Sequence, residues 1–399
     1  MHTGPIYLVG PAGNPNFGDE FITASWLRYL AATDPLTDVW LDCPQPGLAQ
    51  VLFDGLHPRL RVTNTLWRLS QDYADAPAEQ LTELVAQRIT ALGSPAYDLG
   101  LLKLRQARSI HLLGGGYVNG NWAHHAALIH ALRAVGRLTG AALFATGQGL
   151  MPALPERQRT GLFAGFSHVS VRDEASAETY GLPQGLDDAF LGLGAELRRS
   201  ARSAGLYVCI QSDTADPNLF DNAVRLARRE ITAALARNLE VHYIECIPGA
   251  DRVAYERLAD LIPARRFLPF TDIWARGLPL SPQHQWITSR FHIHLLAAAA
   301  GARGIALGLK PGYYDVKHSS VAALGSGWTV ALDASDHRMP EHAGTLAADA
   351  PHHIATKEAE ARRLYPAPTA AGKLISHRDA AAQRVAGVLR RSAHAARLR

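Results

Sequence analysis

The segment IYLVGPAGNPNFGDE, residues 6–20, decides the prediction of the fold. Its first four residues, Ile6–Val9, form a short apolar run typical of a buried strand, and a loop rich in glycine, asparagine and proline follows. A helical pattern then covers about Asp19–Leu30. A strand that leads through such a loop into a helix is the first half of a βαβ unit, in which two parallel strands are joined by a helix.

The same alternation recurs twice along the chain. Further strands are predicted at Ser109–Leu113, Ala141–Thr146 and His168–Val171, with a helix over Ala123–Leu138 and a short helix that Gly181 ends. The pattern then restarts with strands at Gly205–Ile210, Val241–Ile244, Gln285–Ile287 and Gly304–Leu307, and with a helix over Leu219–Ala236. This alternation predicts an α/β protein with two doubly wound parallel-sheet, Rossmann-like domains that face a cleft.

The length of 399 residues also favours two domains, and a composition of 47% hydrophobic and 19% charged residues allows a large core. We expect one domain over residues 1–192 and a second over residues 204–365, with Leu193–Ser203 as the linker. Residues 366–399 are expected to form a terminal helix that packs back on the first domain. Its arginines fall among alanines, so contact with acidic lipid is an alternative to a solvated basic face.

Charge and cysteine usage exclude several classes of protein. The net charge of +4 is mild, and the sequence contains no basic stripe with interleaved aromatic residues, so nucleic acid is not expected as a partner. Cys43, Cys209 and Cys246 stand apart without a CxxC pair, which disfavours a disulfide framework and a structural zinc site. The apolar run near the N-terminus is too short for a signal peptide or a membrane span, and we expect a cytoplasmic protein.

Glycines and polar side chains follow the predicted strands, where ligands bind in open parallel sheets. The positions are Gly13, Asn16, Gly18 and Asp19 after the first strand, Gly114, Gly115 and Gly116 after the second, Gln148 after the third, and Arg172 after the fourth. Each glycine has a purely conformational alternative, and Asp19 has the alternative of capping the following helix. The first loop lacks the glycine spacing of a dinucleotide or P-loop motif, which disfavours a nicotinamide oxidoreductase.

The segment Ser289-Arg290-Phe291-His292 follows a strand of the second half. Thr288 or Ser289 can cap the next helix, and a helix N-terminus attracts anions. Histidine changes charge near neutral pH, so His292 suits proton transfer, with a structural histidine as the alternative. Arg172 can bind phosphate or carboxylate with its planar guanidinium or can form a surface ion pair. The pair of His292 and His294 has no third ligand at suitable spacing, so no metal is expected.

These pieces, taken in order, resemble the polysaccharide pyruvyl transferase family. The pieces are GNPNFGDEF, HLLGGG, GQGL, SVRDEASAETYG followed by DDAF, SRFH and YYDVK, and they span about residues 6–330. The resemblance implies a fold like that of the two-domain GT-B glycosyltransferases. It also implies phosphoenolpyruvate as the donor, a saccharide or lipid-linked saccharide as the acceptor, and no cofactor besides this co-substrate. The acceptor would lie on the N-terminal side and the donor on the C-terminal side.

By position, the resemblance implies His292 as the catalytic residue and Arg172, Ser289 and Arg290 as donor-binding residues. Lys317 matches the lysine of the family's Tyr-Asp-Pro-Lys segment, but Val316 replaces the usual proline and the stretch from His292 to Lys317 is longer. Lys310 therefore competes with Lys317. The resemblance also leaves open a glycosyltransferase that uses a nucleotide sugar, a catalytically silent glycan-binding protein on the same fold, and a homo-oligomer.

Overall fold

The computed structural model describes residues 4–198, 204–333 and 336–367, and the strands of these residues form two six-stranded parallel sheets. The first sheet has the order β3 (Leu60–Thr63), β2 (Val39–Asp42), β1 (Ile6–Val9), β4 (Ser109–Leu112), β5 (Ala142–Gln148) and β6 (His168–Val171). The second has the order β12 (Thr329–Ala331), β11 (Arg303–Leu307), β10 (Gln285–Thr288), β7 (Gly205–Cys209), β8 (Glu240–Ile244) and β9 (Phe267–Leu268).

Both sheets have the same doubly wound order, because the first strand of each half pairs with both the second and the fourth. This is the strand order of Rossmann-type domains, in which the chain reverses direction beside the first strand and opens a crevice there. Strands β1, β4 and β7 are buried along their whole length, as expected for parallel strands covered on both faces. The predicted fold class, an α/β protein with two doubly wound parallel-sheet, Rossmann-like domains, is confirmed.

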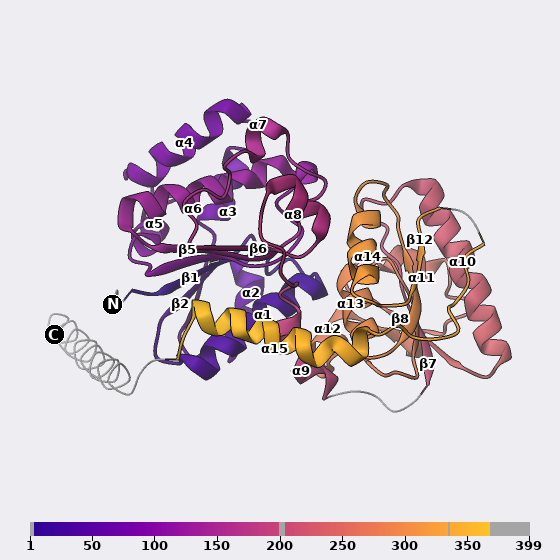
Figure 1. Ribbon diagram of the computed structural model, residues 1–399. Helices are drawn as coiled ribbons and strands as arrows, with labels where there is room; N and C mark the ends of the chain where they lie inside the picture. Colours follow the sequence, from indigo (N-terminus) through magenta and orange to yellow (C-terminus); the bar gives the residue numbers. More distant parts are fainter. Residues whose placement is uncertain (1–3, 199–203, 334–335, 368–399) are drawn as a thin grey trace, which may run out of the picture.

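Helices cover both faces of each sheet (Figure 1). In the N-terminal half they are α1 (Phe17–Thr33), α2 (Pro46–Leu52), α3 (Leu66–Asp72), α4 (Ala78–Thr90), α5 (Asp98–Leu104), the 3-10 helix η1 (Gly120–His125), α6 (Ala126–Thr139), α7 (Glu156–Arg159), α8 (Glu174–Tyr180) and α9 (Phe190–Leu197). The C-terminal half contains α10 (Pro217–Ala236), α11 (Arg252–Glu256), the 3-10 helix η2 (Ala264–Arg266), α12 (Phe270–Arg276), α13 (Phe291–Ala299), α14 (Tyr314–Ala323) and α15 (Leu346–Leu364).

Local sequence explains these helices well. The Asp216 carboxylate accepts hydrogen bonds from the backbone N–H groups of Asn218 and Leu219, and Pro217 occupies the first position of α10. The buried residues of α10 recur on one face, which packs on the second sheet. Gly181 ends α8 with a φ of 61°, as the sequence predicted. Among the described residues, none of the helices combines the length and apolar character that a bilayer span requires.

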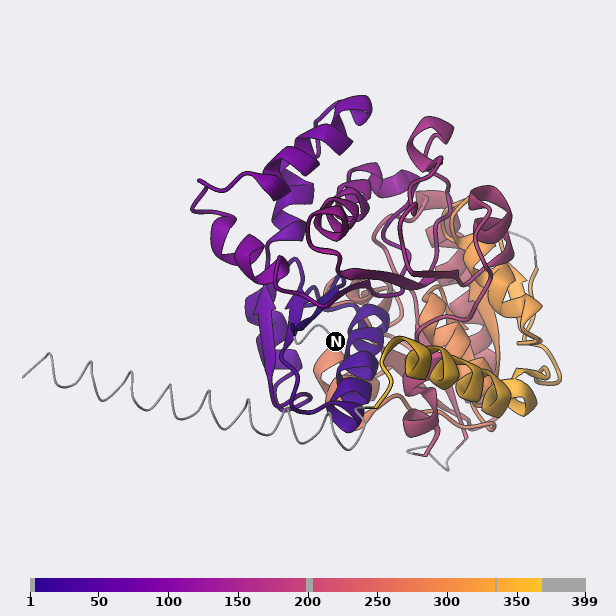
Figure 2. The same ribbon diagram turned by 60° about the vertical axis from the view of Figure 1, so that its left-hand side comes forward.

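One cluster of buried hydrophobic side chains spans both domains, and each domain also has a cluster of its own. A single cluster of buried side chains includes Phe21 and Trp26 of α1 together with Trp286 of β10 and Leu296 of α13. Burying one large apolar side chain stabilises a fold by about 1.5–3 kcal/mol, so a shared cluster of this kind opposes separation of the domains. Helix α15 belongs to this cluster and runs from the C-terminal domain to the N-terminal domain (Figure 1, Figure 2).

The expected domain boundaries stay predictions, and two observations bear on them. The segment Leu193–Ser203, expected as a linker, begins inside helix α9. Helix α15 lies within the range 204–365 but packs against α9, so a helix of the C-terminal half does contact the N-terminal domain. The terminal helix expected over 366–399, with its arginines, lies almost entirely outside the described residues.

Candidate active site

A cavity of about 880 Å³ lies between the two domains, at the carboxyl ends of both sheets. Segments after β1, β2, β3, β4 and β6 line it from the N-terminal side, and segments after β7, β8, β10 and β11 line it from the C-terminal side. Eight of the residues singled out from the sequence line this one cavity: Asn16, Gly18, Asp19, Gly116, Arg172, Arg290, His292 and Lys317. The fold therefore brings together residues from positions 16 to 317 of the chain.

Arg172 is fixed by a buried ion pair. Its Nη1 atom lies 2.8 Å from Oδ2 of Asp187, and both side chains are 3% exposed. The guanidinium also lies over the ring of Phe291, 4.1 Å from its centroid, which is a favourable cation–π arrangement. Arg172 thus does not form the alternative surface ion pair with the acidic residues that follow it in sequence. Asp173 instead caps α8, where its carboxylate accepts a hydrogen bond from the N–H of Ser176 at 2.8 Å.

Asp187 connects Arg172 to His292. Its Oδ1 atom lies 3.6 Å from Nε2 of His292, which is too long for a hydrogen bond. Within the described part of the chain, this Nε2 atom has no hydrogen-bond partner although it is buried. Burial by itself would raise the pKa of Asp187, but His292 and Arg172 hold this pKa well below its ordinary value. Asp187 therefore remains a carboxylate that fixes Arg172 by an ion pair and faces His292.

Two basic side chains converge at Gly116. A Cβ placed on this glycine would lie 3.0 Å from Nη2 of Arg172 and 3.3 Å from Nζ of Lys317. Burial, and then the positive charge of Arg172, lower the pKa of Lys317 well below its ordinary value, while Asp19 opposes this shift. Two cations that approach one point repel each other, so an anion placed between them would be bound favourably.

Aromatic and carboxylate side chains surround Lys317. Its Nζ atom lies 3.7 Å from the ring centroid of Tyr313, in a second cation–π contact. Asp19 faces His292, Lys317 and Arg172, and its pKa is raised by burial against the opposing effect of these three groups. The Nδ2 atom of Asn16 donates a hydrogen bond to Asp19 at 2.7 Å. The cavity therefore contains a histidine and a carboxylate within one cluster, which are the group types used for proton transfer.

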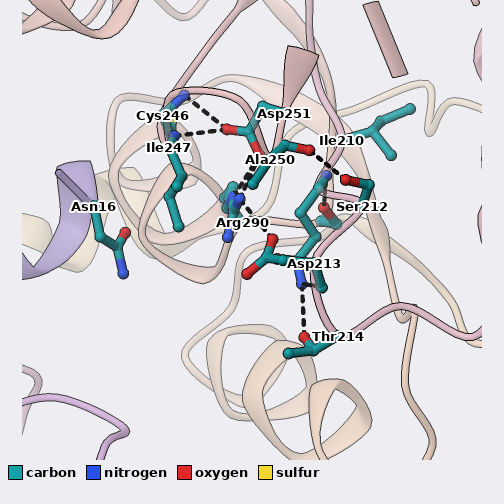
Figure 3. A network of polar contacts seen from close by, with 12 residues as sticks. Asn16, Ile210, Ser212, Asp213, Thr214, Cys246, Ile247, Ala250, Asp251 and Arg290 are labelled. Carbon is teal, nitrogen blue, oxygen red and sulfur yellow. Dashed lines mark hydrogen bonds and ion pairs between the residues drawn. The ribbon is translucent and has the colours of Figure 1, made fainter. Parts of the chain in front are cut away.

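Arg290 is engaged by two carboxylates of its own domain (Figure 3). Its Nε atom donates to Oδ1 of Asp251 at 3.0 Å, and its Nη2 atom contacts both this oxygen and Oδ1 of Asp213, the latter at 3.1 Å. Burial opposes the charged form, but Asp251 and Asp213 raise the pKa of Arg290 above its ordinary value. With two anionic partners, Arg290 attracts a further anion less strongly than Arg172 and Lys317 do together.

The other residues expected at the site do not line the cavity. Ser289 is fully buried, and its hydroxyl accepts a hydrogen bond from the backbone N–H of Gln211 at 2.9 Å. Lys310 lies outside the cavity, where its Nζ atom donates to Oδ1 of Asn121 at 3.1 Å. Of the two candidate lysines, the fold therefore presents Lys317 to the cavity.

Four cleft-loop residues have internal roles. The N–H of Gly13 donates to Glu20 at 2.8 Å, and the N–H of Gly114 donates to Asp188 at 2.9 Å. The Gly115 carbonyl accepts a hydrogen bond from Gly149. Gln148 is fully buried and its amide donates to the carbonyls of Leu112, Leu113 and Thr146. These residues shape the loops beneath the cavity, so the expectation that they contact a ligand directly has no support in the geometry.

Two expected helix caps are wrong. Helix α1 begins at Phe17, so Asn16 is its N-cap and Asp19 lies in the first turn. Helix α13 begins at Phe291 with Arg290 as its N-cap, and the Thr288 hydroxyl accepts the N–H of Arg290 at 3.0 Å. Ser289 caps nothing, because the paired strands turn its hydroxyl toward the loop after β7.

Two cysteines that are far apart in sequence meet near Arg290. Cys209, Cys246 and Asp251 are buried, and their potential ligand atoms lie within 4.8 Å of one another. Asp251 already accepts hydrogen bonds from the N–H groups of Cys246 and Ile247, at 2.7 and 2.9 Å, besides those from Arg290. Both oxygens of the Asp251 carboxylate thus accept hydrogen bonds and need no metal ion to be satisfied.

Asp187 and Asp251 were not predicted as partners of the two arginines. The DDAF segment, which carries part of the family resemblance, contains Asp187. No local signal exists for Asp251, whose partner Arg290 lies 39 positions away. Tyr313 was noted only within YYDVK, although its ring packs on Lys317.

Comparison with known proteins identifies the family to which the chain belongs. No significant match was found among curated proteins. Among solved structures, the UDP-GlcNAc 2-epimerase from Neisseria meningitidis bound to UDP-GlcNAc has a TM-score of 0.49 and 10% identity, and the alignment covers 91% of this chain and 92% of that one. The putative UDP-N-acetylglucosamine 2-epimerase from Listeria monocytogenes has a TM-score of 0.48 and 11% identity over 89% and 88% of the two chains. Likeness at this level does not bear on activity.

The family model described as polysaccharide pyruvyl transferase matches residues 16–311. This range contains both sheets except for β1 and β12, and it includes Arg172, Arg290 and His292. The chain belongs to the polysaccharide pyruvyl transferase family.

Proposed function

We propose that this protein transfers pyruvate from phosphoenolpyruvate to hydroxyls of a saccharide or lipid-linked saccharide and forms a pyruvate ketal. The observation that supports this most strongly is the convergence of Arg172 and Lys317 on one point of a cavity that His292 also lines. Phosphoenolpyruvate carries a phosphate and a carboxylate. Cations are needed to bind these two groups and to stabilise the charge on the phosphate as it leaves. The family match supports the same class of reaction.

Each cavity residue has a role in this proposal. Arg172 and Lys317 bind the anionic groups of the donor, and Arg290, which also lines the cavity, contributes further positive charge. His292 lies at the first turn of α13 and shuttles the proton, and the Asp187 carboxylate faces its ring and favours the charged imidazolium. Asp19 is the second titratable group beside the donor and can accept a hydroxyl proton.

The reaction balances without a further reactant. A proton is added to the methylene carbon of phosphoenolpyruvate, and an acceptor hydroxyl forms a C–O bond to the electron-poor C2 while its proton passes to a base. The bond from C2 to the phosphate oxygen then breaks, and phosphate leaves with the electron pair. A second hydroxyl of the same acceptor bonds to C2 and loses its proton, which closes the ketal. The net change consumes one phosphoenolpyruvate and one diol and yields one ketal and one phosphate.

The test is incubation of the protein with phosphoenolpyruvate and a panel of glycosides and lipid-linked saccharides. We expect phosphate release together with a product heavier than the acceptor by one pyruvate less one water. The Lys310→Met variant serves as an active control, because Lys310 lies outside the cavity. If the protein does not bind phosphoenolpyruvate in calorimetry, the proposal is wrong.

Two alternatives predict other outcomes in the same experiment. A glycosyltransferase would consume a nucleotide sugar without phosphoenolpyruvate, and a silent glycan-binding protein would bind saccharide without releasing phosphate. The cations at Gly116 favour a small donor with two anionic groups over a silent binder, because neutral glycans gain nothing from two like charges held close together.

A further inference from the structure

Helix α15 carries a fully buried lysine into the N-terminal domain. Lys357 and Asp188 form an ion pair in which Nζ and Oδ1 are 2.8 Å apart, and both side chains are 0% exposed. Lys357 also contacts Oε2 of Glu360 at 2.6 Å. The other oxygen of Glu360 accepts hydrogen bonds from His168 and Ser170 of β6, each at 2.7 Å. The end of α15 is thus tied to the N-terminal sheet by buried charges.

Asp188 forms hydrogen bonds to several segments of the N-terminal domain beneath the cavity. Its Oδ2 atom accepts hydrogen bonds from Nε1 of Trp26, the hydroxyl of Thr146 and the N–H of Gly114, at 2.7, 2.7 and 2.9 Å. The glycines beside it cannot be replaced, because a Cβ on Gly114 or Gly147 would come within 2.8 Å of Asp188 atoms. One carboxylate therefore joins α1, the loop after β4 and strand β5.

The residue before Asp188 is Asp187, which holds Arg172 and faces His292. Asp188 also fixes Gly114, two positions before the glycine at which Arg172 and Lys317 converge. A displacement of the Asp188 carboxylate would therefore shift Asp187 and Gly116, which lie against the donor-binding side chains. The Asp188 carboxylate is balanced only while Lys357 stays in place, since a buried charge without its partner is strongly destabilised.

We propose that Lys357 is a positioning residue for the active site, which acts through Asp188 on Asp187, Arg172 and His292. Lys357 lies beyond residues 16–311, the range that the family model matches. Helix α15 is in this view part of the catalytic architecture as well as of the hydrophobic core. As far as it concerns the donor, this inference rests on the proposed function.

The experiment compares Lys357→Met and the isosteric Asp188→Asn with a matched control, Glu358→Gln, which alters an exposed residue of the same helix. All variants are assayed at a temperature at which circular dichroism shows each of them folded. For both Lys357→Met and Asp188→Asn we expect kcat/KM for phosphoenolpyruvate to fall by about 100-fold, the effect of a displacement of about 1 Å at a reacting group. The control should keep the wild-type value.

A second measurement does not depend on the donor. The rate at which diethylpyrocarbonate modifies His292, followed by mass spectrometry of its peptide, should rise in Lys357→Met and Asp188→Asn and stay unchanged in the control. If wild type does not use phosphoenolpyruvate, the proposed function fails and this rate alone decides the inference. If Lys357→Met does not fold, Asp188→Asn decides. Folded variants with wild-type kinetics and wild-type His292 reactivity would show that Lys357 only stabilises the fold, and the proposal would be wrong.

Discussion

Gly18 lies directly against His292: a Cβ placed on Gly18 would be 1.8 Å from the Nδ1 atom of the histidine. The glycine belongs to α1 of the N-terminal domain and the histidine to α13 of the C-terminal domain. The side chain that we assign to proton transfer is therefore positioned by the opposite domain. Glycine is needed here for space, because this contact leaves no room for a methyl group.

Gly18→Ala is expected to displace His292 and lower kcat/KM for phosphoenolpyruvate by about 100-fold, since small misplacements of a reacting group are costly. Steady-state kinetics measures the effect. Gly47→Ala is the matched control, because nothing lies within 4 Å of a Cβ at this helical position. Equal activity of the two variants would mean that the Gly18 contact is not required.

His292→Ala should abolish phosphate release while leaving the fold intact. Loss of a general acid or base lowers the rate by about 10²–10⁴-fold. The remaining ion pair of Arg172 and Asp187 keeps the buried carboxylate balanced, so the melting temperature should change little. Phosphate release at the wild-type rate by the folded variant would remove the proposed role of His292.

Arg172→Ala should lower the free energy of unfolding and, as an independent effect, weaken donor binding. It leaves Asp187 buried without its main ion-pair partner, which we expect to cost about 3–5 kcal/mol of unfolding free energy. The double variant Arg172→Ala/Asp187→Asn should recover part of the melting temperature but keep a raised KM for phosphoenolpyruvate. A double variant with wild-type KM would show that Arg172 serves the fold alone.

Lys317→Met should weaken donor binding by about tenfold or more, as the loss of a charge-assisted contact does. Burial and Arg172 lower the pKa of Lys317, and an anionic donor beside it should raise this pKa again, so Lys317 should take up a proton when the donor binds. Calorimetry in buffers of different ionisation enthalpy measures this uptake. It should disappear in Lys317→Met and persist in Lys310→Met; identical uptake in both variants would contradict the assignment.

Glu20 makes stability depend on pH. Burial, and then the nearby Asp19, raise the pKa of Glu20 from 4.5 to about 8. The folded state therefore keeps a proton that the unfolded chain releases, and the contribution of Glu20 to stability declines as pH rises from 4.5 to about 8. Glu20→Gln cannot lose this proton. Relative to wild type, its melting temperature should increase over this pH range.

The exposed Glu83→Gln on α4 is the control for this measurement. Its melting temperature relative to wild type should be the same throughout the pH series. If the difference in melting temperature between Glu20→Gln and wild type were independent of pH, Glu20 would not hold a proton in the folded state.

Patterns of apolar residues, glycine and proline within short segments predicted local helices and strands well. The strand Ile6–Val9, its loop and the following helix are as predicted, because the short apolar run ends at a loop rich in glycine and proline that a helix would not continue through. Strands β2, β3, β9 and β12 were not predicted. Each is only two to four residues long, and β3, β9 and β12 lie at sheet edges, where partial exposure breaks up the apolar run.

By itself, then, the sequence determined two Rossmann-like halves, the family, and the set of polar residues that follow the strands. Local apolar periodicity and loop glycines carry that information within a few residues. Tertiary structure alone decided which of these residues share a cavity, that Lys317 rather than Lys310 enters it, and that Asp187, Asp251 and Lys357 balance the buried charges. The physical reason is that a buried charge is stabilised by whatever partner lies within a few ångströms, and Lys357 meets Asp188 from 169 positions away.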